Sequence, residues 1–148
     1  RYVDSLVRTL RAAPAGVGVD FLFIAHDALI QRARNDLLVA AISHLPILVS
    51  SGLVLVATKS PKWSKMAELA ATGFRDVTRL ASGSPAMSRD ICLTNREPIL
   101  RWLDEYVREL GTLRRLVADG GTELEEAFVQ AREQRERWLG MLRDKGTK

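Results

Sequence analysis

Apolar residues recur with a helical period along most of the chain. From Ala28 onward they fall at steps of three, four and seven residues, as on one face of a helix: Ile30, Ala33, Leu37, Ala41 and Leu48. Pro46 interrupts this pattern, and because proline has no amide donor, we expect the helix to kink or restart there. The next segment, 47–57, is apolar on nearly all sides, which is typical of a helix surrounded by other helices.

Breaks in the pattern divide the middle of the chain. Short helices are expected at 61–71 and 74–80, separated by Gly73. Ser84 followed by Pro85 then favours a helix start, because a serine hydroxyl caps free amide groups and proline fits the first helical position.

The pattern after Pro85 predicts two long helices. The first is expected to reach about residue 118, with a bend or division at Pro98. The break at 119–121 ends it, and segment 122–125 (Thr-Glu-Leu-Glu) has the spacing of a capping box that starts a last helix to about residue 143. Its apolar residues are expected to face inward: Leu124, Phe128, Ala131, Trp138 and Leu142. These patterns predict a mainly α fold, a bundle of about six helices.

The first 25 residues follow a different pattern. A helical period over 2–10 gives way to an alternating, strand-like period over 17–24. One helix and one strand cannot bury both of their faces, so they resemble the end of a larger α/β unit. We therefore expect two parts: residues 1–25 as the tail of a separate domain, and residues 26–148 as an all-helical domain.

The composition argues against several classes of protein. The hydrophobic fraction of 47% and the charged fraction of 27% are ordinary for a globular domain and exclude a disordered chain. The net charge of +4 raises the possibility of nucleic-acid binding, but acidic residues alternate with arginines through 101–115 and 123–143. Such alternation is typical of solvated helix faces, so no nucleic-acid partner is expected, and a basic nucleic-acid-binding helical domain is the less favoured alternative.

Cysteine and apolar content bear on the compartment. A single cysteine, Cys92, cannot form an internal disulfide, which favours a reducing cytoplasmic location. The longest apolar run, 45–57, falls short of the roughly 20 residues of a membrane span, so no membrane partner is expected. The two histidines, His26 and His44, lack metal-ligand spacing, so no metal site is expected.

Two clusters carry candidate chemistry. His44 follows Ser43 at the proline break, where an imidazole can face a cavity; the alternative is a core histidine bonded to a carbonyl. Arg75, Asp76 and Arg79 lie on a short helix beside a glycine, where two guanidinium groups could hold an anionic substrate. A surface ion pair of little energetic weight is the alternative for this second cluster.

Two other segments are less specific. Asp90, Asn95 and Glu97 are too polar to be core filler and form either a buried polar network or a solvated face. The segment 16–18 (Gly-Val-Gly) lacks the third glycine of a dinucleotide-binding loop and precedes its strand, so a turn is the better interpretation.

Three segments in this order resemble the C-terminal dimerisation domain of prephenate and arogenate dehydrogenases. They are 40–46 (Ala-Ala-Ile-Ser-His-Leu-Pro), 73–81 (Gly-Phe-Arg-Asp-Val-Thr-Arg-Leu-Ala) and 88–97 (Ser-Arg-Asp-Ile-Cys-Leu-Thr-Asn-Arg-Glu). With the final helix, the resemblance extends from about residue 35 to the C-terminus. Residues 1–25 would then be the end of a nucleotide-binding Rossmann domain.

The resemblance implies an NAD- or NADP-dependent oxidative decarboxylation in tyrosine biosynthesis. The substrate is a cyclohexadienol acid, prephenate or arogenate, and the helical half supplies a homodimer interface and part of the substrate pocket. The nucleotide fold and the catalytic histidine of such enzymes lie in the N-terminal domain, so no catalytic residue is expected in this chain, which is expected to be inactive alone. The cofactor-binding residues of this chain, if it has any, stay unknown from the sequence.

The resemblance also assigns roles to the two clusters. Arg79 would bind a substrate carboxylate, and Asp76 and Arg75 would shape the pocket entrance or pair across the dimer. His44, with Ser43 beside it, would line the cleft.

Three positions depart from the family pattern. Ile47 stands where the family commonly has a second, substrate-lining histidine, Ser88 replaces a usual tryptophan, and Asn35 replaces the histidine of a His-Asp pair. Losing a hydrogen-bonding group from a closed pocket is expected to weaken recognition of prephenate or to change the substrate. These departures leave open a non-catalytic helical dimerisation module derived from the family.

Overall fold

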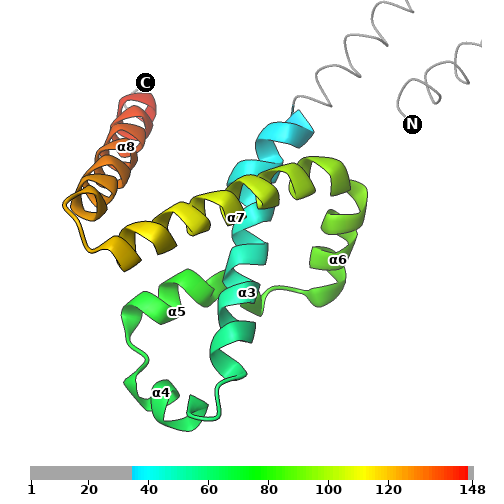
Figure 1. Cartoon of the computed structure of the whole chain (residues 1–148). Coiled ribbons are helices and arrows are strands. Elements are labelled where there is room, and N and C mark those ends of the chain that lie inside the picture. The colour runs from blue at the N-terminus through cyan, green and yellow to red at the C-terminus, as the bar shows by residue number, and fades with distance from the viewer. Residues whose placement is uncertain (1–34, 147–148) are drawn as a thin grey trace, which may run out of the picture. The chain divides into compact units, whose positions relative to one another are not determined.

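The computed structural model describes residues 35–146, which are helical throughout apart from short turns (Figure 1). A helical segment at 35–39 leads through a π-helical turn, η1, into α3; a 3-10 turn, η2, lies between α5 and α6. The elements are η1 (Ala40–His44), α3 (Leu45–Thr58), α4 (Trp63–Leu69), α5 (Thr72–Thr78), η2 (Arg79–Ser82), α6 (Pro85–Thr94), α7 (Arg96–Asp119) and α8 (Glu123–Gly146).

The mainly α prediction is confirmed for this part of the chain, which holds six numbered α-helices and no strand. The helix and strand expected at 2–10 and 17–24 lie outside the described residues. The chain divides into two compact units, one ending at Trp102 and one beginning at Leu103, so α7 contributes its first turns to one unit and the rest to the other.

The kink or restart expected at Pro46 takes the form of a π-helical turn within a continuous helix. The amide of Leu45 donates to the carbonyl of Ala40, five residues earlier, so η1 holds one residue more than a regular turn. Pro46 then falls in the first turn of α3, directly after the π-helical turn. The surplus residue thus resolves the conflict between proline and a continuous helix.

Residues 35–58 therefore form one uninterrupted helical stretch of 24 residues, and its most apolar 18-residue window has a mean hydropathy of 2.1. By length and composition alone, this stretch is enough to cross a membrane, which the shorter run expected at 45–57 was not. Only 11% of its most apolar window is buried within the chain. Most of its apolar surface therefore requires a cover from outside the described residues.

In the unit that ends at Trp102, α3 packs against α5 and η2. Ser50, on α3, is 1% exposed, and its hydroxyl accepts a hydrogen bond of 3.0 Å from the amide of Ala81 in η2. The rings of Trp63 and Phe74 lie 5.9 Å apart and join α4 to α5. A buried hydroxyl that satisfies a backbone amide fixes where η2 lies along α3.

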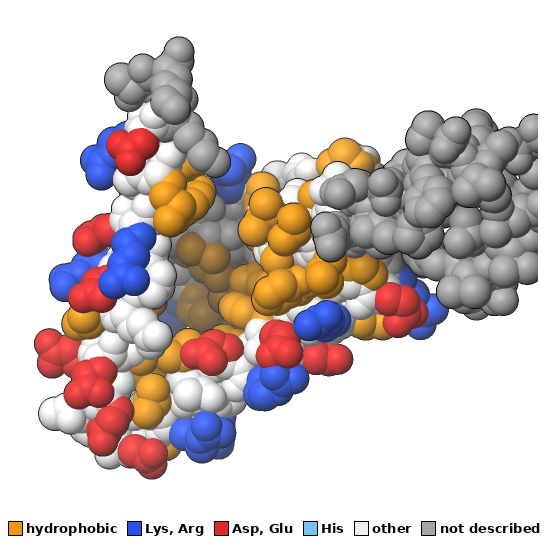
Figure 2. Space-filling view, turned by 90° about the horizontal axis from the view of Figure 1, so that it is seen from above, with side chains coloured by type: hydrophobic (Ala, Val, Ile, Leu, Met, Phe, Trp, Pro, Cys, Tyr) orange, Lys and Arg blue, Asp and Glu red, His pale blue; other side chains and the backbone are white. Residues whose placement is uncertain are grey.

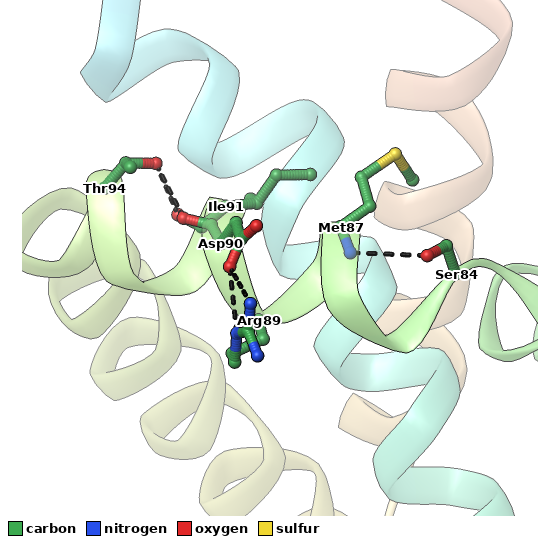
Figure 3. Close-up of polar contacts among 6 residues, drawn as sticks. All are labelled: Ser84, Met87, Arg89, Asp90, Ile91 and Thr94. Atoms are coloured by element: carbon green, nitrogen blue, oxygen red, sulfur yellow. Dashed lines mark hydrogen bonds and ion pairs between the residues drawn. The ribbon is translucent and has the colours of Figure 1, made fainter.

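The start of α6 follows the predicted capping chemistry. The Ser84 hydroxyl accepts a hydrogen bond of 3.4 Å from the amide of Met87, and Pro85 opens the helix (Figure 3). A serine cap of this kind stabilises a helix by about 1 kcal/mol.

The long helix expected from residue 85 to 118 is two helices, and the division is at Asn95, not at Pro98. Asn95 has the non-helical dihedral angles φ −112° and ψ 36°. Pro98 is the third residue of α7, within the first turn, where amide groups have no partner inside the helix. The prediction placed the break at the proline, but a proline in a first turn breaks nothing.

The other unit contains the rest of α7 and α8. Leu103, Tyr106 and Leu113 are half-buried, whereas Leu110 and Val117, at the same helical spacing, are exposed. Of the α8 residues expected to face inward, Leu124 is half-buried, while Phe128, Ala131, Trp138 and Leu142 are exposed. That expectation is wrong for the single chain, because the period identifies an apolar face but does not say which molecule covers it.

Candidate functional site

The site predicted around His44 begins at the π-helical turn. His44 is the last residue of η1 and is half-buried, whereas Ser43 beside it is exposed. π-helical turns inside α-helices occur frequently at functional sites. The turn therefore places one half-buried imidazole and one exposed hydroxyl at the start of α3.

Asn95 is the polar partner of His44. Its side-chain amide nitrogen lies 2.8 Å from the carbonyl oxygen of Asp36 and 3.1 Å from Nδ1 of His44. Asn95 is 7% exposed, so this is a buried network that links the break between α6 and α7 to the helix of residues 35–58. The indole nitrogen of Trp102 donates to the carbonyl of Leu37 at 3.0 Å and makes a second link to the same helix.

The polar residues near Asn95 divide between the two interpretations of the sequence. Asp90 is exposed and pairs with Arg89 at 2.7 Å (Figure 3). Glu97 is exposed as well. Asn95 alone of the three is buried. No sequence signal singles it out, because the residues on either side of it, Thr94 and Arg96, are polar and the stronger break signal is Pro98.

The arginine cluster lies on α5 and η2. Arg75 and Asp76 are 3.8 Å apart, with side chains 77% and 72% exposed, which fits the surface ion pair of the alternative interpretation. Arg79 opens η2 and is also exposed; within residues 35–146 no carboxylate pairs with it. Its guanidinium group is thus available to an external anion.

Ser50 connects the element that carries His44 with the element that carries Arg79. It lies six residues after His44 on the same helical stretch, which corresponds to roughly 9 Å along the axis. Its bond to Ala81 holds η2, and with it Arg79, beside α3. Sequence reasoning did not identify Ser50 as a functional residue, because a serine within an apolar helix gives no sign of a partner 31 residues away.

The positions that depart from the family pattern lie close to these groups in the chain. Ile47, three residues after His44, and Ser88, on α6, are both half-buried. Residues 35–146 contain no group of three or more potential metal ligands. Cys92 is a half-buried free thiol. The described chemistry is that of hydrogen bonds and charge, carried by an imidazole, hydroxyls and a guanidinium group.

The surface charges of the described residues are mixed. On the face shown in Figure 2, acidic and basic side chains are interspersed, with apolar side chains between them. Ion pairs such as Arg137 with Glu133, 3.7 Å apart, follow the helical spacing expected from the sequence. This pattern differs from the single-sign stripe of a nucleic-acid-binding face.

The sequence is similar to that of known dehydrogenases. Residues 32–132 match the family described as the prephenate dehydrogenase dimerization domain. The chain is 38% identical over 125 residues to the prephenate dehydrogenase of Bacillus subtilis, covering 82% of this chain and 33% of that protein. It is 31% identical over 110 residues to the cyclohexadienyl dehydrogenase of Zymomonas mobilis, covering 72% of this chain and 38% of that protein.

Solved structures agree with these matches. The Synechocystis arogenate dehydrogenase superposes with a TM-score of 0.69 at 25% identity, covering 78% of this chain and 47% of that one. A prephenate dehydrogenase from A. aeolicus, solved with hydroxyphenyl propionate and NAD+, has the same fold with a TM-score of 0.64 at 24% identity, covering 84% and 48%. This chain spans only about a third of the curated relatives' length. The match over residues 32–132, more than half of the sequence, shows that the chain belongs to the prephenate dehydrogenase dimerization-domain family, as the three sequence segments predicted.

Proposed function

We propose that this chain is the dimer-forming and substrate-binding half of an NAD- or NADP-dependent prephenate or arogenate dehydrogenase of tyrosine biosynthesis. The observation that carries the proposal is the match to the dimerization domain over residues 32–132. In the complete enzyme, hydride would pass from the ring carbinol to the nicotinamide, carbon dioxide would leave, and the ring would become aromatic. Such a biosynthetic role places the protein in the cytoplasm.

The proposed domain boundaries are those expected from the sequence, and the family match over residues 32–132 lies within the second domain. Residues 26–148 are the helical domain, and residues 1–25 are the end of the nucleotide-binding domain. We assign no catalytic residue to this chain. Its contribution is to bind and orient the substrate and to hold two copies together, so it is inactive by itself.

The exposed apolar surface supports a homodimer. Among the described apolar residues, only Ala40 and Ile99 are buried. The large apolar residues that are more than half exposed in the single chain are Leu38, Ile42, Leu55, Val56, Leu69, Val77, Met87, Leu93, Val107, Val117, Phe128, Trp138 and Met141. Obligate homodimer interfaces resemble a domain core cut in half, which is the surface that this chain presents.

We expect the 148-residue chain to sediment, without detergent, at twice its mass of 16.5 kDa across micromolar concentrations. Val56→Asp is expected to weaken this dimer at least about tenfold, because it places a charge in an apolar interface. Thr58→Asp introduces the same carboxylate at an exposed polar position of α3 and is expected to leave the dimer intact. A stable monomer, or a chain that stays in solution only with detergent, would contradict the proposal.

The substrate site is proposed at η1 and η2. Arg79 binds a carboxylate of the ring acid, because a guanidinium group matches a carboxylate with two parallel hydrogen bonds. His44 and Ser43 line the cleft from the start of α3, and Asp76 with Arg75 shapes its entrance. The support is the exposure of Arg79 and the Ser50 bond that holds η2 beside α3.

The described residues do not supply a nucleotide site. Dinucleotides bind where a glycine-rich turn joins a strand to a helix, and residues 35–146 contain no strand. The NAD or NADP of the proposed reaction would therefore be held mainly by a domain beyond them.

A non-catalytic dimerisation module is the second candidate. It is favoured by Ile47 and Ser88, which replace a hydrogen-bonding and an aromatic group of the family pattern. The two functions are distinguished by adding the upstream coding region and measuring NAD(P)H formation with prephenate and with arogenate. Turnover with either acid supports the enzyme, whereas a folded dimer without turnover supports the module.

A further inference from the structure

We propose that Asn95 is a positioning residue that fixes the tautomer of His44, so that the imidazole presents an N–H group at Nε2 to an oxygen of the substrate. The inference rests on the proposed function in one respect, that η1 borders the substrate site. The fixed tautomer itself follows from the contacts of three residues.

The first step is the orientation of the Asn95 amide. A carbonyl oxygen only accepts hydrogen bonds, and the carbonyl of Asp36 lies 2.8 Å from the Asn95 nitrogen. Turning the amide over would place two acceptor oxygens against each other. The NH2 group of Asn95 must therefore face Asp36, and its second hydrogen is free to donate elsewhere.

The second step is the protonation of the imidazole. Nδ1 of His44 lies 3.1 Å from the same NH2 group, which can only donate. Nδ1 must then be the acceptor, and a neutral imidazole that accepts at Nδ1 carries its proton at Nε2. The ring nitrogen that remains for other partners is consequently a donor.

The third step is the rigidity of Asn95. The backbone amide of Asn95 donates to the carbonyl of Ile91 at 3.0 Å, and its backbone carbonyl accepts from the amide of Ile99 at 3.2 Å. The backbone is therefore held on both sides of the break between α6 and α7. Asn95 is 7% exposed, so water competes little for its side-chain amide. The residue that holds the ring is thus itself held in place.

The fixed tautomer has a chemical consequence for His44. A donor at Nε2 can bind a carboxylate, carbonyl or hydroxyl oxygen. It cannot remove a proton from the substrate, because Nε2 is already protonated and Nδ1 is occupied by Asn95. His44 is therefore a binding group and not a general base, with Asn95 acting through it.

The direct test measures the tautomer in the 148-residue chain. Long-range proton–nitrogen correlation spectra of the 15N-labelled protein, at a pH where imidazole is neutral, distinguish the two tautomers, and His26→Gln identifies the His44 signals. We expect the Nε2–H pattern for His44, and an average of both tautomers in Asn95→Ala. An Nδ1–H pattern in the unsubstituted chain overturns the inference, whether or not Asn95→Ala folds.

A second test measures the consequence in the enzyme that carries this chain together with its nucleotide-binding domain. Asn95→Ala is expected to raise the KM for the ring acid about tenfold with little change in kcat, since a ground-state hydrogen bond is weakened. In a His44→Ala background, the same substitution should have no further effect on KM. Full additivity of the two substitutions would contradict a role through His44.

The two tests separate this inference from the proposed function. A fixed Nε2–H tautomer in a protein without dehydrogenase activity would contradict the proposed function and the substrate-binding role of His44. It would still support the inference that Asn95 fixes the tautomer of His44. An active dehydrogenase whose His44 carries its proton at Nδ1 removes the inference and leaves the function.

Discussion

Arg79→Ala is expected to lower kcat/KM for the ring acid by about 30- to 1,000-fold, equivalent to about 2–4 kcal/mol. The guanidinium group faces no carboxylate of the described chain, so a substrate carboxylate would be its main charge partner. Removing it leaves that carboxylate desolvated and unpaired in the closed enzyme. Arg79→Lys should give an intermediate loss, because an ammonium group keeps the charge but not the paired hydrogen bonds.

The measurement is steady-state kinetics of the complete dehydrogenase, with sedimentation to confirm that the dimer persists. Arg137→Ala is a matched control: this arginine is also exposed and pairs only with Glu133 on its own helix. Its effect on kcat/KM should stay within about 1 kcal/mol. A KM that is unchanged by Arg79→Ala would remove η2 from the substrate site.

The second large effect is expected at Ser50. Ser50→Ala removes the acceptor of the Ala81 amide and leaves a part-buried donor without a partner, which costs about 1–3 kcal/mol of the free energy of unfolding. Because η2 carries Arg79, the substitution should also raise the KM for the ring acid. A loss of stability and a loss of substrate affinity are thus expected from one hydroxyl that contacts no substrate.

Urea unfolding of the 148-residue chain, at one fixed protein concentration, measures the first effect. Ser51→Ala is the control, since Ser51 is the next residue on α3 and its hydroxyl makes no hydrogen bond within residues 35–146. If both substitutions change the free energy of unfolding equally, then the Ser50–Ala81 bond does not hold η2 in place.

Local features of this fold could be predicted from the sequence because their causes are local. The Ser84 cap depends on residues three positions apart. α8 starts at Glu123, directly after the predicted break at 119–121, where Gly120 has a φ of 65°. The break at Asn95 could not be placed, because Pro98 is the stronger signal in the sequence and only the observed helix start shows that it is harmless.

The site was predictable in its residue types but not in its contacts. His44 and Arg79 were singled out from short segments, and their roles stay predictions. Asn95 and Ser50 were not linked to them, because their partners lie 51 and 31 residues away and depend on how the helices pack. The exposure of Phe128 and Trp138 was missed for a related reason, since a single sequence does not say which copy of a chain covers an apolar face.

The extra residue of the π-helical turn determines which way residues 35–39 face around the helix axis. Deleting a single residue within 40–44 would remove the surplus residue of the turn and rotate residues 35–39 by roughly 100° about the helix axis. The carbonyls of Asp36 and Leu37 would then leave Asn95 and Trp102 together. Chain length at η1 is accordingly far less tolerant of an insertion or deletion than the solvent-facing turn between α3 and α4.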